Sequence, residues 1–262
     1  MNEVEAIAAR LAEARRTRTA LAEFPGTVPT TLEAAYAIQR AGIARRGIDA
    51  IAGWKVGRIP PALAERLGED RFVGPVFRDG VADAPAQGEA VFPVFDGGSA
   101  AFEAEVAVVL GALPDGVSAA TPDRARGWIV TAHIAVEVAG SPVATLPSLG
   151  AFGSIPDQGN NNGQIIGAAI PVAALDDPAA LTCTTRIDGV EVARASASAL
   201  PGGPLAALAF AARRVARMGL RLEPGQFVST GAITGVHAVR AGQACVADFG
   251  HRGTIACRSR AM

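Results

Sequence analysis

The chain of 262 residues has few of the residues that mark disulfide-rich or nucleic-acid-binding proteins. Its three cysteines, Cys183, Cys245 and Cys257, are odd in number and show no C-x-x-C spacing, so we expect small buried thiols in a reducing compartment. The net charge is −1 with both signs interspersed, which leaves no basic stripe for nucleic acid. These features predict a cytoplasmic protein without a nucleic-acid partner.

Membrane and export signals are also missing from the sequence. No apolar run is long enough to cross a bilayer, and the start Met1-Asn-Glu-Val-Glu lacks the basic residues and apolar core of a secretory signal. Half of the residues are apolar, and a chain of this length can bury a substantial core. We therefore expect a soluble protein that acts on small molecules.

Acidic residues inside apolar segments are the most informative feature that is present. Glu103 and Glu105 precede the apolar run 106–110, which is rich in β-branched residues and predicts a strand with both carboxylates on one face. Glu137 interrupts a second apolar segment, residues 134–139, whose small residues leave room for a ligand. Burial of neighbouring carboxylates requires a cation, and oxygen ligands suit Mg²⁺ or Mn²⁺ better than Zn²⁺.

A structural alternative exists for each of these acids. Glu103 or Glu105 could face solvent at the start of an edge strand, and Glu137 could pair with an arginine. Acidic pairs on strands are common, and their spacing alone is not a full motif.

The first 50 residues have helical periodicity and the remainder is mainly β. A helix is predicted over residues 2–24, with arginines such as Arg15 on its other faces, and a second follows the capping-box pair Thr30 and Glu33 and ends at Gly47. The domain organisation predicted from this change is an N-terminal helical segment, residues 1–50, packed on a β-rich catalytic domain, residues 51–262. That pattern favours an α+β fold over a doubly wound sheet.

Three further elements are predicted in the second part of the chain. Thr121-Pro122 is a start signal for a short helix over residues 123–132. Asp188-Gly189 separates two β-type runs and favours a two-residue hairpin turn. Residues 203–218 form an Ala/Leu/Arg helix that Gly219 ends.

Five segments, read in order, form a recognisable series: Gly53-Trp-Lys-Val-Gly57, Phe102-Glu-Ala-Glu-Val-Ala-Val-Val-Leu110, Ala135-Val-Glu-Val138, Asp157 to Gly167, and Thr230 to Gly250. The series resembles the 2-keto-4-pentenoate hydratase family, which belongs to the larger fumarylacetoacetate hydrolase superfamily. The resemblance covers nearly the whole chain and is far more specific than any single motif.

The resemblance implies a mixed β-sandwich or roll core with helices outside, and a Mg²⁺ or Mn²⁺ site at Glu103, Glu105 and Glu137. It implies a small-molecule 2-oxo acid substrate and hydration of a 2-hydroxydienoate to a 4-hydroxy-2-oxo acid, as in aromatic catabolism. The alternatives are a decarboxylase of a 4-oxalocrotonate-type diacid and a non-catalytic ligand-binding or partner subunit. The resemblance also implies a homo-oligomer, or pairing with a related decarboxylase chain.

Other site residues are expected from matches to the family. Lys55 would bind the substrate carboxylate or transfer a proton, and Gly57 would let the backbone approach a ligand; the alternative is a surface lysine beside Trp54. Asp79 matches an acidic position and is a candidate proton-transfer group, or else part of a plain Asp-Gly turn.

The loop around Asp157 departs from the family pattern. Asp157 matches, but the family's serine is replaced within three consecutive asparagines, and Asn161 is expected to contact substrate or to cap a turn. Glu137 is followed by Val-Ala-Gly-Ser-Pro142 where hydratases have Asp-Ser-Arg or a similar sequence. Hydrolases of the superfamily use a His-Glu pair early in the β domain, and no histidine occurs between Met1 and Ala132, which favours hydration or decarboxylation.

Overall fold

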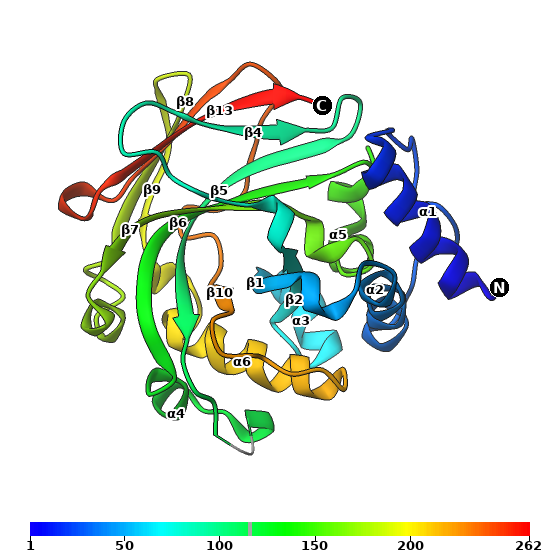
Figure 1. The fold of residues 1–262 in the computed structure, drawn as a ribbon, viewed down its shortest axis with the longest axis horizontal. Helices are drawn as coiled ribbons and strands as arrows, with labels where there is room; N and C mark the ends of the chain where they lie inside the picture. The colour runs from blue at the N-terminus through cyan, green and yellow to red at the C-terminus, as the bar shows by residue number, and fades with distance from the viewer. Residues whose placement is uncertain (115–116) are drawn as a thin grey trace.

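Two β-sheets dominate the computed structural model, which describes residues 1–114 and 117–262 (Figure 1). The eight-stranded sheet has the order β2-β1-β10-β5-β6-β7-β3, with β11 beside β5. Its strands are β1 (Ile51–Arg58), β2 (Arg71–Phe77), β3 (Val81–Asp83), β5 (Ser99–Leu110), β6 (Ile129–Ser141), β7 (Asn161–Ile170), β10 (Phe227–Ser229) and β11 (His237–Ala238). The five-stranded sheet, in the order β4-β13-β12-β8-β9, consists of β4 (Ala90–Val94), β8 (Thr182–Ile187), β9 (Val190–Ser196), β12 (Ala244–Asp248) and β13 (Thr254–Ala261).

The helices pack outside these sheets, which confirms the predicted α+β class. They are α1 (Glu3–Thr17), α2 (Leu32–Arg46), α3 (Pro61–Leu67), α4 (Pro122–Arg126), α5 (Leu146–Ser154) and α6 (Gly203–Arg217). Figure 1 shows α1, α2 and α5 grouped on one side of the molecule and α6 along the bottom, opposite the five-stranded sheet. In the described part of the chain, no helix combines the length and apolar character needed to span a membrane.

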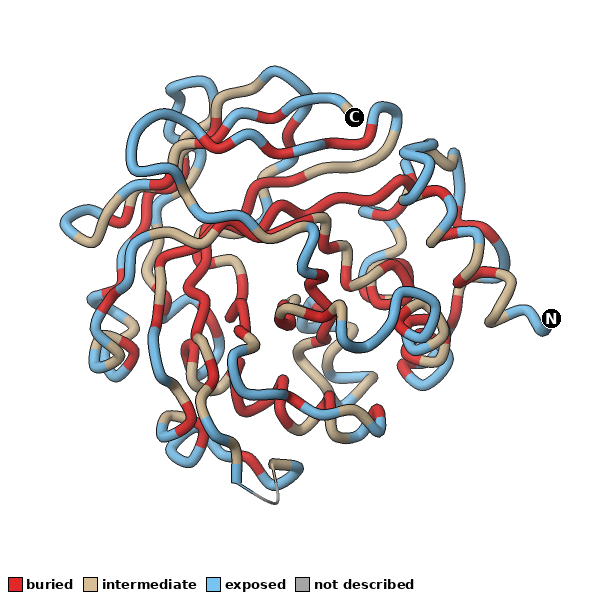
Figure 2. Tube along the Cα trace, in the orientation of Figure 1, coloured by how far each residue is buried: buried red, intermediate tan, exposed pale blue. Residues whose placement is uncertain are grey.

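The two faces of the central strands differ in side-chain size. Phe102, Val106 and Val108 of β5 alternate onto one face and belong to the large apolar core. Full burial of each such side chain stabilises the fold by roughly 1.5–3 kcal/mol relative to leaving it exposed. The opposite face has a smaller cluster that includes Ala107 and Ala135. Figure 2 shows buried residues continuing along these strands. Small residues on the second face leave space for polar side chains.

The predicted first helix is too long. α1 ends at Thr17, because Arg18 adopts the left-handed conformation with φ 57° and stops the helix. Leu21, which lies inside the predicted helix range 2–24, instead forms an isolated parallel bridge with Val143. The helical spacing of apolar residues continues beyond the end of the helix, and the residue that ends it is Arg18 and not a glycine, so the sequence did not indicate this end.

Boundaries of two other helices also differ from the prediction. Thr31, and not Thr30, caps α2 by accepting a hydrogen bond from the Ala34 N–H at 3.2 Å. The helix predicted over 123–132 ends at Arg126, because residues from Ile129 onward pair with β5.

Local signals elsewhere are confirmed. Asp188 and Gly189 have φ values of 49° and 80°, the positive values that a primed turn requires between β8 and β9. The helix predicted over 203–218 corresponds to α6, and Gly219 after it is left-handed with φ 74°.

The three cysteines are free and buried, as predicted. Cys245 and Cys257 lie directly opposite each other on β12 and β13. Burial is the main cause that raises the pKa of each thiol, including Cys183, to about 12. Such thiols are poor nucleophiles and serve as core residues.

Candidate metal centre

Three glutamates meet on the small-residue face of the eight-stranded sheet. Glu103 and Glu105 lie on β5, and Glu137 lies on β6 directly opposite Glu103. One carboxylate oxygen from each lies within 4.8 Å of the others. The residues are 5%, 0% and 0% exposed, respectively, so the solvent-facing alternative is excluded.

The electrostatics of this cluster disfavour three bare negative charges. Burial, followed by the neighbouring Glu137 carboxylate, raises the pKa of Glu103 to about 8. Burial and the Glu137 and Glu103 charges raise the pKa of Glu105 well above its ordinary value. A further cation would offset this repulsion and restore the ionised forms.

Lys55 supplies one positive charge from β1. Its Nζ lies 3.3 Å from Glu137 Oε1, and its side chain is buried, so it is not a surface lysine. Burial alone would lower the pKa of Lys55, but the three carboxylates together raise it above its ordinary value and keep the amine charged. Its Nζ also lies 5.2 Å from the ring centroid of Phe72. Gly57 makes room for that ring, because a Cβ there would come within 2.2 Å of it.

Hydrogen bonds from β10 and from the segment that follows it fix Glu105. The Ser229 hydroxyl and the Gly231 N–H, the latter at 3.1 Å, both donate to Glu105 Oε2. Gln164 Nε2 donates to the Ser229 hydroxyl at 2.9 Å. Ser229 and Gln164 were not predicted as site residues, because no local spacing links either residue to Glu105 and only the strand register brings them near it.

The asparagine loop reaches Glu137. Asn161 Nδ2 donates to Glu137 Oε1 at 3.0 Å, while Asn161 Oδ1 accepts the Gly163 N–H at 3.1 Å. Asn161 therefore caps a turn and contacts the acidic cluster as well. Asp157 is buried. Arg15 Nε donates to its Oδ1 at 2.6 Å, and the Ser141 hydroxyl donates to its Oδ2 at 2.5 Å.

Asp79 is placed outside the buried cluster. Its side chain is 74% exposed, and both of its oxygens accept from Arg46 Nη2, at 2.6 and 2.7 Å. Asp79 lines a cavity of about 650 Å³ that Asn161 and Gly163 also line. None of the three glutamates lines this cavity, but Asn161, which does, donates to Glu137.

Unsatisfied oxygens indicate that the cluster can hold a divalent cation. Glu105 Oε1 and Glu137 Oε2 are buried and have no hydrogen-bond partner within the described residues. Buried carboxylate oxygens need a hydrogen-bond donor or a cation. An all-oxygen donor set of three carboxylates fits Mg²⁺ or Mn²⁺ and does not resemble the His and Cys sets of zinc sites.

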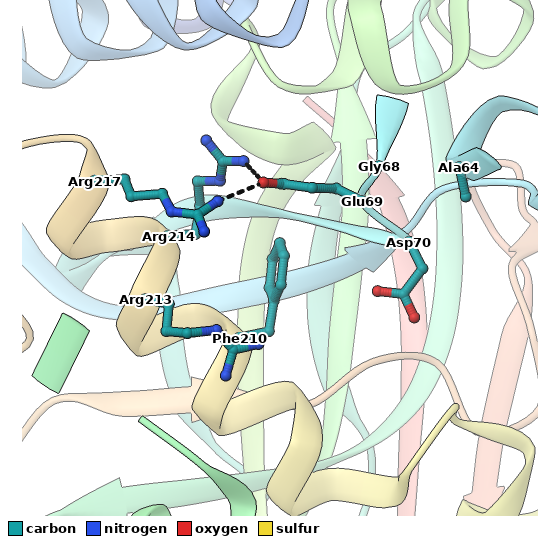
Figure 3. Close-up of a pocket in the computed structure, with 8 residues that line it drawn as sticks. All are labelled: Ala64, Gly68, Glu69, Asp70, Phe210, Arg213, Arg214 and Arg217. Atoms are coloured by element: carbon teal, nitrogen blue, oxygen red, sulfur yellow. Dashed lines mark hydrogen bonds and ion pairs between the residues drawn. The ribbon is translucent and has the colours of Figure 1, made fainter. Parts of the chain in front are cut away.

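A second cavity, of about 360 Å³, has a structural ion-pair cluster (Figure 3). Glu69 pairs there with Arg214 and Arg217 of α6, and the Arg214 guanidinium also lies 4.8 Å from the Tyr36 ring. None of the predicted site residues lines this cavity. The cluster anchors α6 to the chain before β2.

Comparison with known proteins identifies the family. Residues 84–259 match the family model described as fumarylacetoacetate (FAA) hydrolase C-terminal. The chain is 30% identical to the 2-keto-4-pentenoate hydratase of Burkholderia vietnamiensis, over 97% of this chain and 96% of that protein. The chain belongs to the 2-keto-4-pentenoate hydratase family. A hydratase of the same name from Paraburkholderia phymatum is also 30% identical over the same shares of both chains, so the resemblance drawn from the ordered segments is confirmed.

Solved structures share the fold of this hydratase-family chain. The 4-oxalocrotonate decarboxylase from Pseudomonas putida G7, complexed with magnesium and adipate, has a TM-score of 0.80 at 21% identity and covers 99% of this chain and 97% of its own. The fumarylpyruvate hydrolase from Pseudomonas aeruginosa, in complex with Mn²⁺ and pyruvate, has a TM-score of 0.57 at 19% identity and covers 80% and 89%. The predicted β-rich superfamily fold is thereby confirmed.

Proposed function

We propose that the chain is a hydratase, dependent on Mg²⁺ or Mn²⁺, that adds water to a 2-hydroxydienoate and releases a 4-hydroxy-2-oxo acid. One observation carries the proposal: three buried carboxylates lie within 4.8 Å of one another beside a buried lysine. The hydratases that are 30% identical over 97% of the chain support the reaction class.

Glu103, Glu105 and Glu137 would hold the ion, and Glu105 Oε1 and Glu137 Oε2 are buried oxygens without a hydrogen-bond partner within the described residues. A divalent ion bound there supplies a Lewis acid that stabilises negative charge on the oxygen of a 2-oxo acid. Ser229 and Gly231 orient Glu105, and Asn161 orients Glu137, so these three residues set the directions of the carboxylates. Loss of such a partner typically costs a metal site about 10- to 100-fold in metal affinity or activity.

Lys55 is the best-supported proton carrier in the proposal. It is the single lysine among 24 basic residues, so arginine supplies every other side-chain cation of this kind in the chain. An ammonium is a compact point charge that can release a proton, whereas a guanidinium cannot. The position beside Glu137 therefore has the chemistry that moving a proton onto and off the substrate requires.

The reaction needs such proton movement. Loss of the C2 hydroxyl proton and addition of a proton at C5 leave a double bond conjugated with the C2 ketone, which makes C4 electrophilic. Water then adds its oxygen at C4 and a proton at C3. Lys55 would hold the substrate carboxylate or carry one of these protons with the N–H groups that Glu137 does not engage.

Other roles stay predictions. Asp79 as a proton-transfer group and Gly57, Asp157 and Asn161 as substrate contacts are expectations from the family match. The buried free thiols support a reducing compartment and hence a cytoplasmic location. The family resemblance supports a homo-oligomer or pairing with a decarboxylase chain, and light scattering with and without such a chain distinguishes the two. The division at residue 50 is testable by expressing residues 51–262 alone.

The test is a panel of 2-hydroxydienoates with added Mg²⁺ or Mn²⁺. We expect loss of the conjugated absorbance and a product one water heavier by mass spectrometry, with no CO₂ released. Glu137→Gln is the matched control and should be nearly inactive while folded. Release of CO₂ from an oxo-diacid would assign a decarboxylase instead, and no turnover of any member would assign a non-catalytic subunit.

A further inference from the structure

Arg15, near the end of α1, is buried where an exposed helix residue was expected. Its side chain is only 7% exposed, whereas that of the next residue, Arg16, is 71% exposed and pairs with Glu13 on the same helix. Arg15 Nε and Nη2 bind both oxygens of Asp157, at 2.6 and 2.9 Å. This is the bidentate geometry that arginine forms with a carboxylate and that lysine cannot form.

Two further hydrogen bonds of Arg15 reach segments beside the metal centre. Nη2 donates to the Gly140 carbonyl at 2.9 Å, three residues after Glu137 on β6. Nη1 donates to Asn162 Oδ1 at 3.4 Å, next to Asn161. One guanidinium therefore connects β6 to both ends of the loop 157–162.

That loop has a backbone that needs external support. Gln158, Gly159 and Asn160 are consecutive and all left-handed, with φ values of 58°, 69° and 64°. Residues other than glycine rarely adopt this backbone conformation, and it persists only where the surrounding structure holds it. Asn161, the donor to Glu137, follows directly.

Helix attachment alone does not require this guanidinium. A separate apolar cluster already packs α1 onto the molecule through Ile7 and Leu11 of α1 with Ile38, Val143 and Leu146. The Arg15 guanidinium, whose burial carries a desolvation cost, instead pairs with Asp157 in the loop that contains Asn161.

We propose that Arg15 is a positioning residue of the metal centre: its guanidinium holds the loop 157–162 against β6, so that Asn161 keeps Glu137 in its ligand orientation. The inference rests on the proposed function, because it takes Glu137 as a metal ligand. It makes the N-terminal helix, outside the matched residues 84–259, part of the active site.

The test measures Mn²⁺ affinity by electron paramagnetic resonance, independently of turnover. Arg15→Met should weaken Mn²⁺ binding about tenfold, the lower end of the effect of losing an outer partner of a ligand. Arg15→Lys keeps the charge without the bidentate contact, so its Mn²⁺ affinity should lie between those of Arg15→Met and the wild type. Arg16→Met, the matched control, should bind Mn²⁺ as the wild type does.

A double variant separates positioning from simple charge balance. Arg15→Met with Asp157→Asn leaves no unpaired buried charge, so its thermal stability should recover relative to Arg15→Met. If Arg15 positions the loop, Mn²⁺ affinity should stay weakened in this double variant. Recovery of wild-type affinity there, or wild-type affinity in folded Arg15→Met, would overturn the inference.

The two proposals fail differently in these measurements. A wild type that binds Mn²⁺ but hydrates no dienoate contradicts the proposed function, while the affinities of the Arg15 variants still decide the positioning role. A wild type without Mn²⁺ binding contradicts both. Arg15→Lys and Asp157→Asn provide the same comparison of affinities if Arg15→Met does not fold.

Discussion

Replacing Lys55 with methionine removes the chain's single lysine while keeping a similar side-chain length. The ammonium lies 3.3 Å from Glu137 Oε1, and the two side chains are 4% and 0% exposed. Removing one partner of a buried ion pair costs about 3–5 kcal/mol, because an unpaired charge remains. The glutamate cluster can take up a proton in response, so we expect a loss near 3 kcal/mol in the metal-free protein.

A bound divalent ion should reverse most of this loss, since it returns positive charge to the same carboxylates. The assay is urea unfolding of wild type and Lys55→Met near pH 8, once with chelator and once with saturating Mn²⁺. The difference in unfolding free energy should shrink clearly with Mn²⁺. Turnover of the dienoate should stay low even with metal, because the proton carrier is absent.

Arg214→Met provides the matched control. It breaks another buried ion pair, with Glu69, in the cavity that no site residue lines. Its loss of stability should be the same with and without Mn²⁺. If Lys55→Met were as stable as the wild type without metal, or if Mn²⁺ left its deficit unchanged, the shared electrostatics of Lys55 and the glutamates would be refuted.

Four further predictions concern the carboxylates. Glu105→Gln should fold normally by circular dichroism but bind Mn²⁺ weakly, with turnover partly restored by excess Mn²⁺; full turnover at low Mn²⁺ would exclude Glu105 as a ligand. Burial raises the pKa of Glu103 to about 8 and also raises the pKa of Glu105, so metal binding below pH 8 displaces protons. Mn²⁺ affinity measured by calorimetry should therefore rise with pH up to at least about 8, by about tenfold per pH unit for each proton displaced, and a flat profile would contradict this. For the same reason the folded metal-free protein holds more protons than the unfolded chain between the ordinary pKa of 4.5 and about 8, so its stability should fall as pH rises through that window. Ser229→Ala should cost about 1–3 kcal/mol in urea unfolding and weaken Mn²⁺ binding, since Glu105 loses a donor, whereas exposed Ser148→Ala should change neither.

The acids of the site were predictable because their surroundings are local in sequence. Glu103 and Glu105 share a strand face by spacing, and the apolar neighbours of all three glutamates indicate burial. The hairpin at Asp188 and Gly189 was predictable for the same reason, since two adjacent residues decide the turn.

What the sequence could not indicate depends on register and packing. Ser229 reaches Glu105 only because β10 pairs with β5, and no spacing between the two residues encodes that pairing. Arg15 was expected on an outer face of an amphipathic helix, but the 157–162 loop covers that face of α1. A single helical pattern identifies the face against the nearest core and says nothing of a second partner.

The measurement that tests the account most directly follows bound Mn²⁺ and dienoate hydration in the same samples during a metal titration of the chelated protein. The account predicts that hydration is absent without metal and rises in proportion to one bound ion, and that Glu137→Gln loses both together. Full hydration after exhaustive chelation would contradict it and would move the chemistry to side chains acting without a metal.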